Sequence, residues 1–387
     1  MSCHLFLIIL YFVHTLAKLN IDKTRASHFE WPKICSASLS LLHRARVLFP
    51  FSAVRTTPHT RTHTRRGRAR DMAGGYVCSL SPELVERARV ELGENPETRA
   101  QEVQKLREAL ARRPDIPART DDAFLLRFLR ARKFDHEKTL KLIKNYYKCH
   151  QTWPDVFQDF RPSAVKNVLD SGFIRVVPQR DSQGRRIIIQ SPGKWNPSTT
   201  PIIENLRAMY MTLELLLQSE ETQVNGIVLL GDYKGLGLAQ VTNFSPYFVK
   251  RMTTVLQDAF PMRIKGQSSI NEPVIFKAVF AMIKPFLKEK MRKRMNFHGS
   301  DFLSLHKKIS PDLLPAEYGG TAPAITTDTW TQTLLAAEPY FLETFGNISF
   351  TKAESPDEVL TAEEKKLQED LNRAIEEAGP EEEWTKF

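Results

Sequence analysis

The sequence predicts an α/β protein in which a helical N-terminal region precedes a mostly parallel β-sheet flanked by helices. Two observations support this prediction. Well-marked helix starts follow one another between residues 81 and 153. From Gly172 onward, short runs rich in Val, Ile and Leu alternate with helical segments. This alternation is typical of a parallel sheet covered by helices.

Four helices are predicted before the sheet. Ser81-Pro82 and Asn95-Pro96 each read as an N-cap followed by proline at the first helical position. The third helix, DDAFLLRFLRARKF, has its apolar residues on one face, with Arg127 and Arg130 away from it. A fourth helix spans about 135–153 and carries a further basic face.

The expected order after Gly172 is a strand pair and then alternating helices and strands. The first two strands lie in FIRVVPQRDSQGRRIIIQ, around a turn at Asp181–Gly184. The later elements are a helix over 201–221, a strand in NGIVLLGDY, a helix over 245–258, a short strand in FPMRIKGQSSIN and a helix that begins at Glu272-Pro273. An acidic segment at 354–383 is expected to form a surface or frayed helix.

Charge is distributed unevenly along the 387 residues. Residues 1–71 hold 12 Lys and Arg against 3 Asp and Glu, whereas residues 351–387 hold 5 against 12. Residues 72–350 therefore hold 38 against 30 and are mildly basic. This balance suits a localised basic patch better than a domain that binds nucleic acid throughout.

Residues 1–75 are expected to be a disordered N-terminal extension, or one that the working protein lacks. They include the low-complexity stretch RTTPHTRTHTRRGRAR and six of the ten histidines. The apolar start MSCHLFLIILYFVHTLA resembles a secretory signal but has no basic segment before it, so a signal is the less favoured alternative. The four cysteines form no CxxC pair, which predicts neither a disulfide framework nor a metal cluster and favours a reducing compartment.

No catalytic motif is present in the sequence. GDYKGLGL (231–238) contains GxG but lacks the spacing of a phosphate-binding loop, and neither GxSxG nor HExxH occurs. Asp232 and Glu214 could be paired carboxylates, but such acids are more often hydrogen-bonded structural groups. His298 fits a helix-end cap better than a catalyst. The sequence therefore predicts that the protein is not an enzyme and has no catalytic residue, metal or cofactor.

The stretch IKPFLKEKMRKRMNFHG (283–299) carries six Lys and Arg residues. Ile283, Leu287 and Met291 recur beside them at four-residue spacing, which predicts a basic amphipathic helix. Such a helix could bind nucleic acid, lie on an anionic membrane, or be a solvated face over a core. It continues the apolar segment VIFKAVFAMIKPFL (274–287), and this junction favours a lid over an apolar cavity that opens at an anionic membrane.

Several segments together resemble the CRAL-TRIO family of lipid-transfer proteins, and most closely its alpha-tocopherol transfer protein-like members. In chain order they are DDAFLLRFLRARKFD, QSEETQVNGIVLLGDYKG, NEPVIFKAVFAMIKPFLKEKM, HGSD and LLPAEYGG. The match covers about residues 76–335. Several long segments in the right order make it highly specific.

The resemblance implies a helical N-terminal domain (76–160), a lipid-binding domain (161–335) and, outside the match, an acidic C-terminal tail (336–387). The lipid-binding domain would enclose an apolar cavity under a moving helical lid at about 271–294. The protein would carry a hydrophobic ligand, such as tocopherol (vitamin E), a retinoid or another lipid. It would exchange this ligand between membranes without catalysis.

The resemblance also implies a phosphoinositide-binding site. The basic positions of the tocopherol carrier fall on residues that are all cationic here: Arg132, Arg263, Lys290 and Arg294, with Lys265 alongside. The expected partners are a hydrophobic lipid and a phosphoinositide-containing membrane, and not nucleic acid. The expected location is cytoplasmic, peripheral on endosomal or other phosphoinositide-bearing membranes.

The resemblance further implies which residues line the lipid pocket. The implied positions are Leu206, Met209, Leu213, Ile227, Gly231, Val255, Leu256, Phe260 and Ile264. Met209 and Leu213 stand where the tocopherol carrier has two serines near the ligand hydroxyl, and Gly231 stands where it has a bulky aromatic residue. A roomier and less polar cavity is therefore expected.

Three alternatives remain open. The first is a non-transporting scaffold of the same fold that binds phosphoinositide membranes and protein partners, which a cavity filled by its own side chains would favour. The second is an enzyme of phosphoinositide metabolism. The third is a nucleic-acid binder that uses the basic segment, although that segment lacks interleaved exposed aromatic residues.

Overall fold

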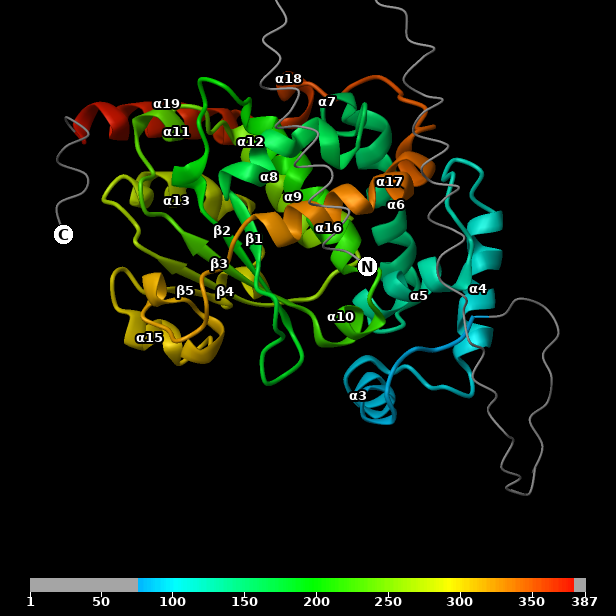
Figure 1. Cartoon of the computed structure of the whole chain (residues 1–387). Helices are drawn as coiled ribbons and strands as arrows, with labels where there is room; N and C mark the ends of the chain where they lie inside the picture. Colours follow the sequence, from blue (N-terminus) through cyan, green and yellow to red (C-terminus); the bar gives the residue numbers. More distant parts are fainter. Residues whose placement is uncertain (1–75, 379–387) are drawn as a thin grey trace, which may run out of the picture. The chain divides into compact units, whose positions relative to one another are not determined.

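The computed structural model describes residues 76–378, so the expectations for residues 1–75 lie outside the described residues. A five-stranded sheet has the order β1-β2-β3-β4-β5 (Figure 1). Its strands are β1 (Ile174–Val176), β2 (Arg186–Gln190), β3 (Ile227–Asp232), β4 (Ile264–Ile270) and β5 (Met295–Phe297). β1 and β2 are antiparallel and all other neighbours are parallel. The predicted mostly parallel sheet is confirmed, and β5 is an addition that the sequence pattern did not reveal.

The four helices predicted before the sheet are confirmed as α3 (Pro82–Leu92), α4 (Arg99–Ala111), α5 (Asp122–Ala131) and α6 (His136–Thr152). Ser81 and Asp121 cap α3 and α5, because each side chain accepts a hydrogen bond from a backbone N–H in the first turn. The predicted cap at Asn95 is wrong. Its Oδ1 accepts from the Glu97 N–H at 3.0 Å in a turn, and α4 begins only at Arg99.

The sheet separates two hydrophobic cores. On one face, β2 and β3 pack with α9 (Ile202–Leu216), α12 (Pro246–Thr254) and α13 (Phe276–Ile283) in the large core. On the other face, β2, β3 and β4 pack with α15 (Phe302–His306) in a smaller core. Side chains of α4, α5 and α6 belong to the large core as well. The domain boundary near residue 160 therefore stays a prediction.

Short helices connect the longer elements: α7 (Pro154–Phe157), α8 (Lys166–Ser171), α10 (Glu220–Asn225) and α11 (Leu238–Val241). The helix predicted over 201–221 is in fact two helices, α9 and α10. The chain breaks between them because the Ser219 side chain accepts a hydrogen bond from the Thr222 N–H and so begins α10.

The prediction of a basic amphipathic helix in residues 283–299 is wrong. α13 ends at Ile283, a 3₁₀ turn follows over Lys284–Phe286, and α14 spans only Glu289–Arg292. Pro285 lacks a backbone N–H, and Leu287 adopts an extended conformation with φ −88° and ψ 128°. The chain then enters β5, which pairs with β4. The predicted lid (271–294) is therefore a broken segment that leads directly into β5.

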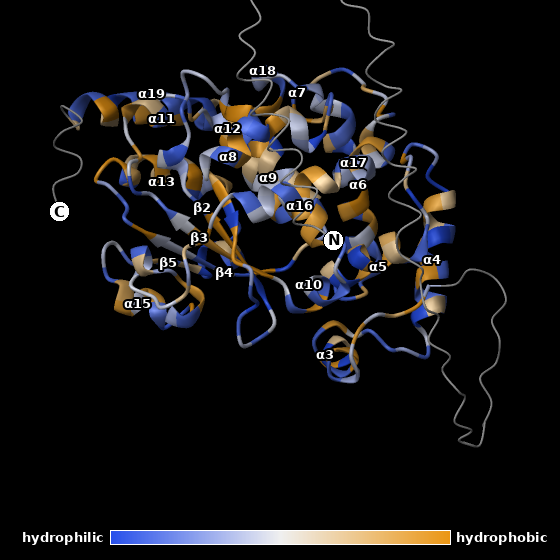
Figure 2. Ribbon diagram, viewed as in Figure 1, coloured by the Kyte–Doolittle hydropathy of each residue, from blue (hydrophilic) through white to orange (hydrophobic). Residues whose placement is uncertain are grey.

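Four α-helices follow α15 in the described residues: α16 (Asp328–Ala336), α17 (Glu338–Phe345), α18 (Pro356–Val359) and α19 (Ala362–Glu377). α19 packs on α13 and also contacts α12 (Figure 1). Hydrophobic and hydrophilic bands alternate along it in Figure 2, and its Leu371 is buried. The predicted acidic helix is thus confirmed over 362–377, and it is docked on the lid. No helix among residues 76–378 is long and apolar enough to cross a membrane.

Candidate functional site

The five cations predicted to bind phosphoinositide lie together around one cleft of about 1020 Å³. Arg132 follows the end of α5, Arg263 and Lys265 flank the start of β4, and Lys290 and Arg294 lie on and just after α14. Further lysines that the sequence reasoning missed line the same space, which we call the basic cleft: Lys133, Lys138, Lys141 and Lys288. Nine Lys and Arg residues thus face only three acids, Glu91, Asp135 and Asp258. The cleft has a strong positive potential.

Glu91 on α3 holds two of the predicted cations. Its Oε2 lies 2.8 Å from Arg263 Nη2 and 2.9 Å from Lys265 Nζ. Burial would raise the pKa of Glu91, but hydrogen bonds and charges from Lys265 and Arg263 outweigh it and lower that pKa to about 2. The carboxylate is therefore charged at neutral pH, where it occupies a position that an anionic ligand could take.

Lys290 lies in the basic cleft among several other cations. It makes no ion pair with any described residue. Burial lowers the pKa of Lys290, and the positive charges of Arg294 and Lys133 lower it further. A bound anion would relieve this repulsion.

Arg132 and Arg294 are fixed by backbone oxygens. Arg132 Nη2 donates to the Gln257 carbonyl at 3.1 Å, and Arg294 Nη1 donates to the Ile264 carbonyl. Burial lowers the pKa of both guanidinium groups, and the charge of Arg263 lowers that of Arg294 further. Each guanidinium thus keeps free N–H donors in a preorganised position, which suits recognition of phosphate oxygens.

A second, smaller cleft of about 460 Å³ continues the basic cleft and shares Lys141 and Lys288 with it. The chain's own acidic C-terminal segment lines it. Glu354 Oε1 lies 2.8 Å from Lys148 Nζ, and Glu354 Oε2 accepts from Trp153 Nε1 at 2.8 Å. Lys148 is thus paired. Lys250 also pairs with Glu364 and Arg251 with Asp155, each at 2.7 Å. Cations without an ion pair are therefore more numerous in the basic cleft than in the second cleft.

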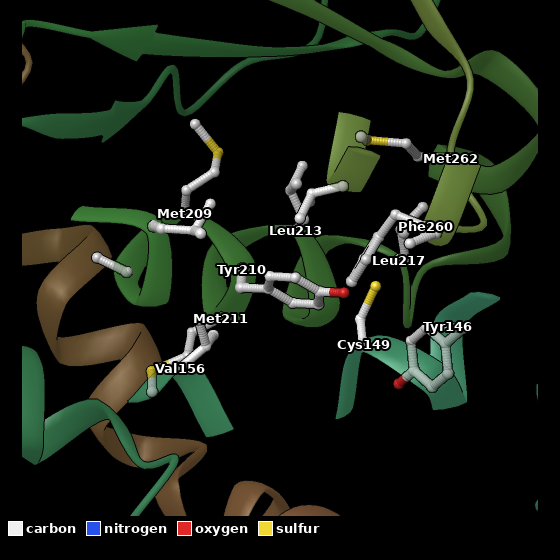
Figure 3. Close-up of a cluster of buried hydrophobic side chains, with 14 of the residues drawn as sticks. Tyr146, Cys149, Val156, Met209, Tyr210, Met211, Leu213, Leu217, Phe260 and Met262 are labelled. Carbon is white, nitrogen blue, oxygen red and sulfur yellow. The ribbon is translucent and has the colours of Figure 1, made fainter. Parts of the chain in front are cut away.

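The nine predicted pocket residues all lie in or beside the large core. They come from α9, β3, the π-helical turn Val255–Ala259, the residue directly after that turn and the start of β4. Figure 3 shows Met209 and Leu213 rising from α9 toward the strands, whereas Met211 points the other way, toward Val156. Met209 and Leu213 therefore lie on the side of α9 that faces the strands. Their role as lipid contacts stays a prediction.

Gly231 does not leave open space in this structure. A Cβ atom there would lie 2.8 Å from the Tyr233 ring, so that ring fills the position a side chain would take. The ring also packs on Phe276 of α13, with centroids 4.4 Å apart. The expectation that Gly231 widens the cavity is wrong in this conformation, because the chain closes the gap with its own Tyr233.

Asp232 and Glu214 are separate structural acids, as expected. Glu214 Oε1 lies 2.8 Å from Arg127 Nη1 and accepts from the Tyr340 hydroxyl at 2.6 Å. Asp232 accepts from the Tyr318 hydroxyl at 2.9 Å. His298 is not a helix cap: its Nδ1 is 2.9 Å from Ser304 Oγ and its Nε2 is 3.2 Å from Ser268 Oγ. No group of His, Cys, Asp and Glu in residues 76–378 could hold a metal ion.

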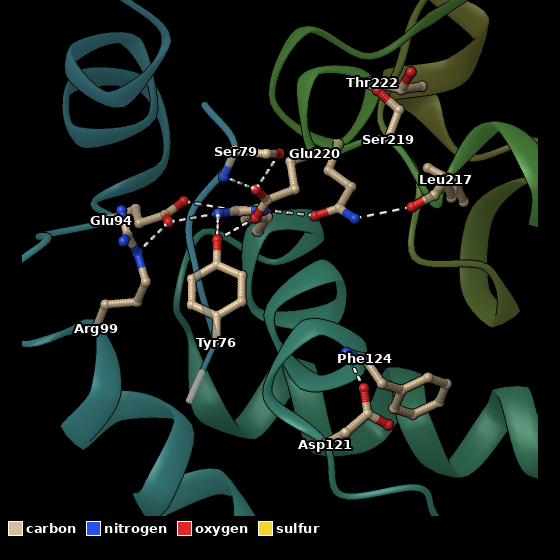
Figure 4. Close-up of polar contacts among 12 residues, drawn as sticks. Tyr76, Ser79, Glu94, Arg99, Asp121, Phe124, Leu217, Ser219, Glu220 and Thr222 are labelled. Atoms are coloured by element: carbon tan, nitrogen blue, oxygen red, sulfur yellow. Dashed lines mark hydrogen bonds and ion pairs between the residues drawn. The ribbon is translucent and has the colours of Figure 1, made fainter. Parts of the chain in front are cut away.

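Arg130 is buried in an ion-pair cluster, although the sequence pattern placed it away from the apolar face. Its guanidinium lies 2.7 Å from each oxygen of Glu94 and 2.8 Å from Glu220 Oε1. Tyr76 and Ser79 donate to Glu220 in the same cluster (Figure 4). The cluster fixes α5 relative to α10, and α5 ends at Ala131, directly before Arg132 of the basic cleft.

Comparison with known proteins identifies similar chains for most of this sequence. Residues 170–320 match the CRAL/TRIO domain family, and residues 95–166 match the family described as Pinta-like, UBA domain.

Individual relatives match over a longer range. Over 272 residues the chain is 52% identical to alpha-tocopherol transfer protein-like of Homo sapiens, and this alignment covers 70% of this chain and 80% of that protein. Over 264 residues it is 40% identical to clavesin-1 of Xenopus laevis, covering 67% of this chain and 80% of the relative. A crystal structure of Sfh5 aligns with a TM-score of 0.40 and 16% identity, over 61% of this chain and 91% of that chain.

Proposed function

Because the chain belongs to the CRAL/TRIO family, we propose that it binds a hydrophobic lipid and transfers it between membranes, docking on phosphoinositides through the basic cleft. The ligand is tocopherol-like, a retinoid or another lipid. The protein acts without catalysis, in the cytoplasm and on endosomal or other phosphoinositide-bearing membranes. One observation carries this proposal: Leu256 and Ile264, two of the predicted pocket residues, line the same cleft as the predicted phosphate-binding cations.

The charge of the basic cleft supports docking on an anionic surface. Each Lys or Arg near such a surface contributes about 1 kcal/mol. The five predicted cations, Arg132, Arg263, Lys265, Lys290 and Arg294, would together contribute on the order of 5 kcal/mol, less what Glu91 already neutralises. That energy corresponds to a residence on the membrane that is up to a few thousandfold longer, and salt would weaken it.

Exposed apolar side chains near the lid support contact with the bilayer. Phe297, at the end of β5, keeps 48% of its surface exposed, and Val274, just before α13, keeps 42%. The Phe297 ring packs on Phe280 of α13 with centroids 4.9 Å apart. Exposed apolar side chains on a protein that also carries a basic cleft suit a membrane whose headgroups are anionic and whose interior is apolar. Entry of Phe297 into the bilayer would draw α13 with it.

Burial of the ligand would supply enough energy to hold it. Burying roughly 400 Å² of an isoprenoid or acyl chain contributes on the order of 10 kcal/mol at ~25 cal/mol per Å². Tyr233 and Phe276 occupy part of the space beside Gly231, so α13 must shift before a ligand can enter there. The lid is therefore the element that we propose to move.

A non-transporting scaffold is a second candidate function, and Tyr233 is the observation that favours it. A core filled by its own side chains would leave the basic cleft to bind membranes and the surface to bind protein partners. The two functions differ in whether lipid moves, so a transfer assay separates them.

The experiment mixes the full-length chain with donor vesicles that contain a fluorescent tocopherol and with acceptor vesicles. The acceptors carry either phosphatidylinositol bisphosphate or enough phosphatidylserine to match its charge. A carrier accelerates transfer in proportion to protein concentration, and does so faster toward the phosphoinositide acceptors. Binding to these vesicles without acceleration of transfer, for this and other labelled lipids, would identify the scaffold instead.

A further inference from the structure

The acidic C-terminal segment is attached to the end of α6 before it reaches α19. The Thr351 N–H donates to the Gln151 carbonyl at 3.0 Å, and the Glu354 N–H donates to the Thr152 carbonyl at 3.1 Å. Both acceptors lie in the last turn of α6, where backbone carbonyls have no partner within the helix. The segment satisfies them and is positioned against the second cleft.

The side chain of Glu354 lies in the second cleft as an anionic ligand would. One of its oxygens is 2.8 Å from Lys148 Nζ, and the other accepts from Trp153 Nε1 at 2.8 Å. Its backbone carbonyl accepts from the Tyr247 hydroxyl of α12 at 2.9 Å. Burial would raise the pKa of Glu354, but the hydrogen bonds from Lys148 and Trp153 outweigh it and lower that pKa. The group is therefore a carboxylate at neutral pH.

A second ion pair ties the start of α19 to α12. Lys250 Nζ lies 2.7 Å from Glu364 Oε2 in the first turn of α19, and it also donates to the Val359 carbonyl. α19 then packs on the lid helix α13, with Leu371 buried (Figure 1). The same segment thus pairs with cations of the second cleft at one end and covers the lid at the other.

The charge of this segment opposes that of the surface beneath it. Residues 351–378 hold 4 Lys and Arg against 9 Asp and Glu. The second cleft continues the basic cleft through Lys141 and Lys288, which line both. An anionic membrane that attracts these cations repels the acids of the segment. The phosphate groups on a phosphoinositide ring also carry more charge than a carboxylate, so they are stronger partners for Lys148 and Lys250.

We propose that residues 354–364 form an electrostatic clasp, which phosphoinositide headgroups of a membrane displace from the second cleft and which thereby releases α19 from the lid. This inference rests on the proposed docking function. The clasp belongs to the same chain, so its effective concentration at the cleft is high. A single soluble headgroup competes poorly with it, whereas a membrane presents many headgroups at once. The lid therefore stays covered away from such a membrane and is freed on it.

Hydrogen exchange in α19 tests the clasp. The full-length protein is measured alone, with plain phosphatidylcholine vesicles, with vesicles that also contain phosphatidylinositol bisphosphate, and with soluble inositol trisphosphate. Sedimentation establishes binding to the vesicles. We expect exchange in α19 to quicken at least about fivefold on the phosphoinositide vesicles alone. Coverage by a membrane would slow exchange, so quicker exchange reports release.

Glu364→Gln and Glu369→Gln form a matched pair of variants. Each removes one negative charge from α19, but Glu369 is exposed and lines neither cleft. Glutamine at 364 can still accept the hydrogen bond from the Thr361 N–H that caps the helix. Glu364→Gln should therefore quicken exchange in α19 without vesicles and tighten vesicle binding about fivefold. Glu354→Gln should do the same, whereas Glu369→Gln should leave exchange unchanged and tighten binding less.

The outcomes separate the clasp from docking itself. Slower or unchanged exchange on phosphoinositide vesicles that bind the protein would overturn the clasp and leave docking through the basic cleft standing. Equal effects of Glu364→Gln and Glu369→Gln would do the same. Failure of the protein to bind these vesicles would overturn both the clasp and the proposed docking.

Discussion

Glu91 on α3 forms an ion pair with Arg263 at the start of β4, with Oε2 and Nη2 2.8 Å apart, and the same oxygen lies 2.9 Å from Lys265 Nζ. One carboxylate is thus paired with two of the five cations that we propose to bind phosphoinositide. An anionic headgroup in the basic cleft must compete with it. We therefore expect Glu91, as well as the cations, to determine the strength of the proposed membrane docking.

Glu91→Gln should strengthen binding to vesicles that contain phosphatidylinositol bisphosphate. Removing one competing negative charge is worth about 1 kcal/mol near an anionic surface, or about fivefold in affinity. Sedimentation of the protein with these vesicles measures the change. Glu86→Gln is the control, because Glu86 pairs only with the exposed Arg89 on the same helix. Unchanged or weaker binding of the Glu91 variant would show that Arg263 and Lys265 do not meet the headgroup.

Lys290→Glu should weaken the same binding about thirtyfold, because reversing one charge changes the interaction by about 2 kcal/mol. Lys293→Glu provides a charge-matched control three residues away. Lys293 pairs with Glu289 on the exposed side of α14 and does not line the basic cleft. If both variants lose affinity equally, docking depends on net charge alone and the cleft is not the site.

Phe297→Ser should shorten residence on the membrane without unfolding the protein. Phe297 is about half exposed, so the change removes roughly 100 Å² of accessible apolar surface, worth about 2 kcal/mol if the ring enters the bilayer. Dissociation from vesicles measured by stopped-flow fluorescence reports the effect. Val90→Ser on α3, another exposed apolar side chain, should dissociate like the unchanged protein. If the Phe297 variant dissociates at the same rate as the Val90 variant, Phe297 does not enter the bilayer.

Unfolding should become easier as the pH falls from 6.5 to 4, because His150 is buried without charge. Burial lowers the pKa of His150 to about 4 from its ordinary value of 6.5. Between these values the unfolded chain binds a proton that the folded chain does not, so the free energy of unfolding falls with pH by on the order of 3 kcal/mol. Urea unfolding at several pH values measures this slope.

His150→Phe should flatten that slope. The imidazole stacks on Phe157 and Phe345, with centroids 4.0 and 5.3 Å away, so an aromatic ring without a titratable group fits the same position. A slope that is unchanged in this variant would assign the acid sensitivity to other groups.

Leu371→Ala should loosen α19 from the lid. Leu371 is buried between α19 and the large core, and deleting such a side chain costs about 2–5 kcal/mol. Hydrogen exchange should then quicken in the amides of α19 and α13 together, because the two helices pack on each other. Leu342→Ala on α17 is the control, since Leu342 is half exposed. Quicker exchange in α19 alone would show that this helix does not hold the lid.

Local sequence patterns were sufficient for most of the helices and strands. Capping side chains such as Ser81 and Asp121 act within one turn, and the apolar run in β3 reflects burial on both faces of a parallel sheet. The break after Ile283 could not be predicted from the spacing of Leu287 and Met291. Both residues are buried as that spacing suggests, but pairing of the following residues with β4 overrides the helical pattern.

The partners of the charged residues could not be predicted from the sequence. The resemblance placed five cations that the fold does bring together in one cleft. It did not reveal Glu91, which meets Arg263 from 172 positions away in the chain. The same limit applies to Arg130, whose helical pattern suggested a surface position. Its partners Glu94 and Glu220 are far from it in sequence and bury it.

Native mass spectrometry of the full-length chain tests the central claim most directly. The protein is purified from cells, mixed with liposomes that contain tocopherols, retinoids and phospholipids, and weighed without denaturation. We predict one lipid retained per chain, identifiable after extraction, with Tyr233→Ala changing which lipid is held. A chain that stays empty in every mixture would contradict the carrier function and leave the membrane-bound scaffold.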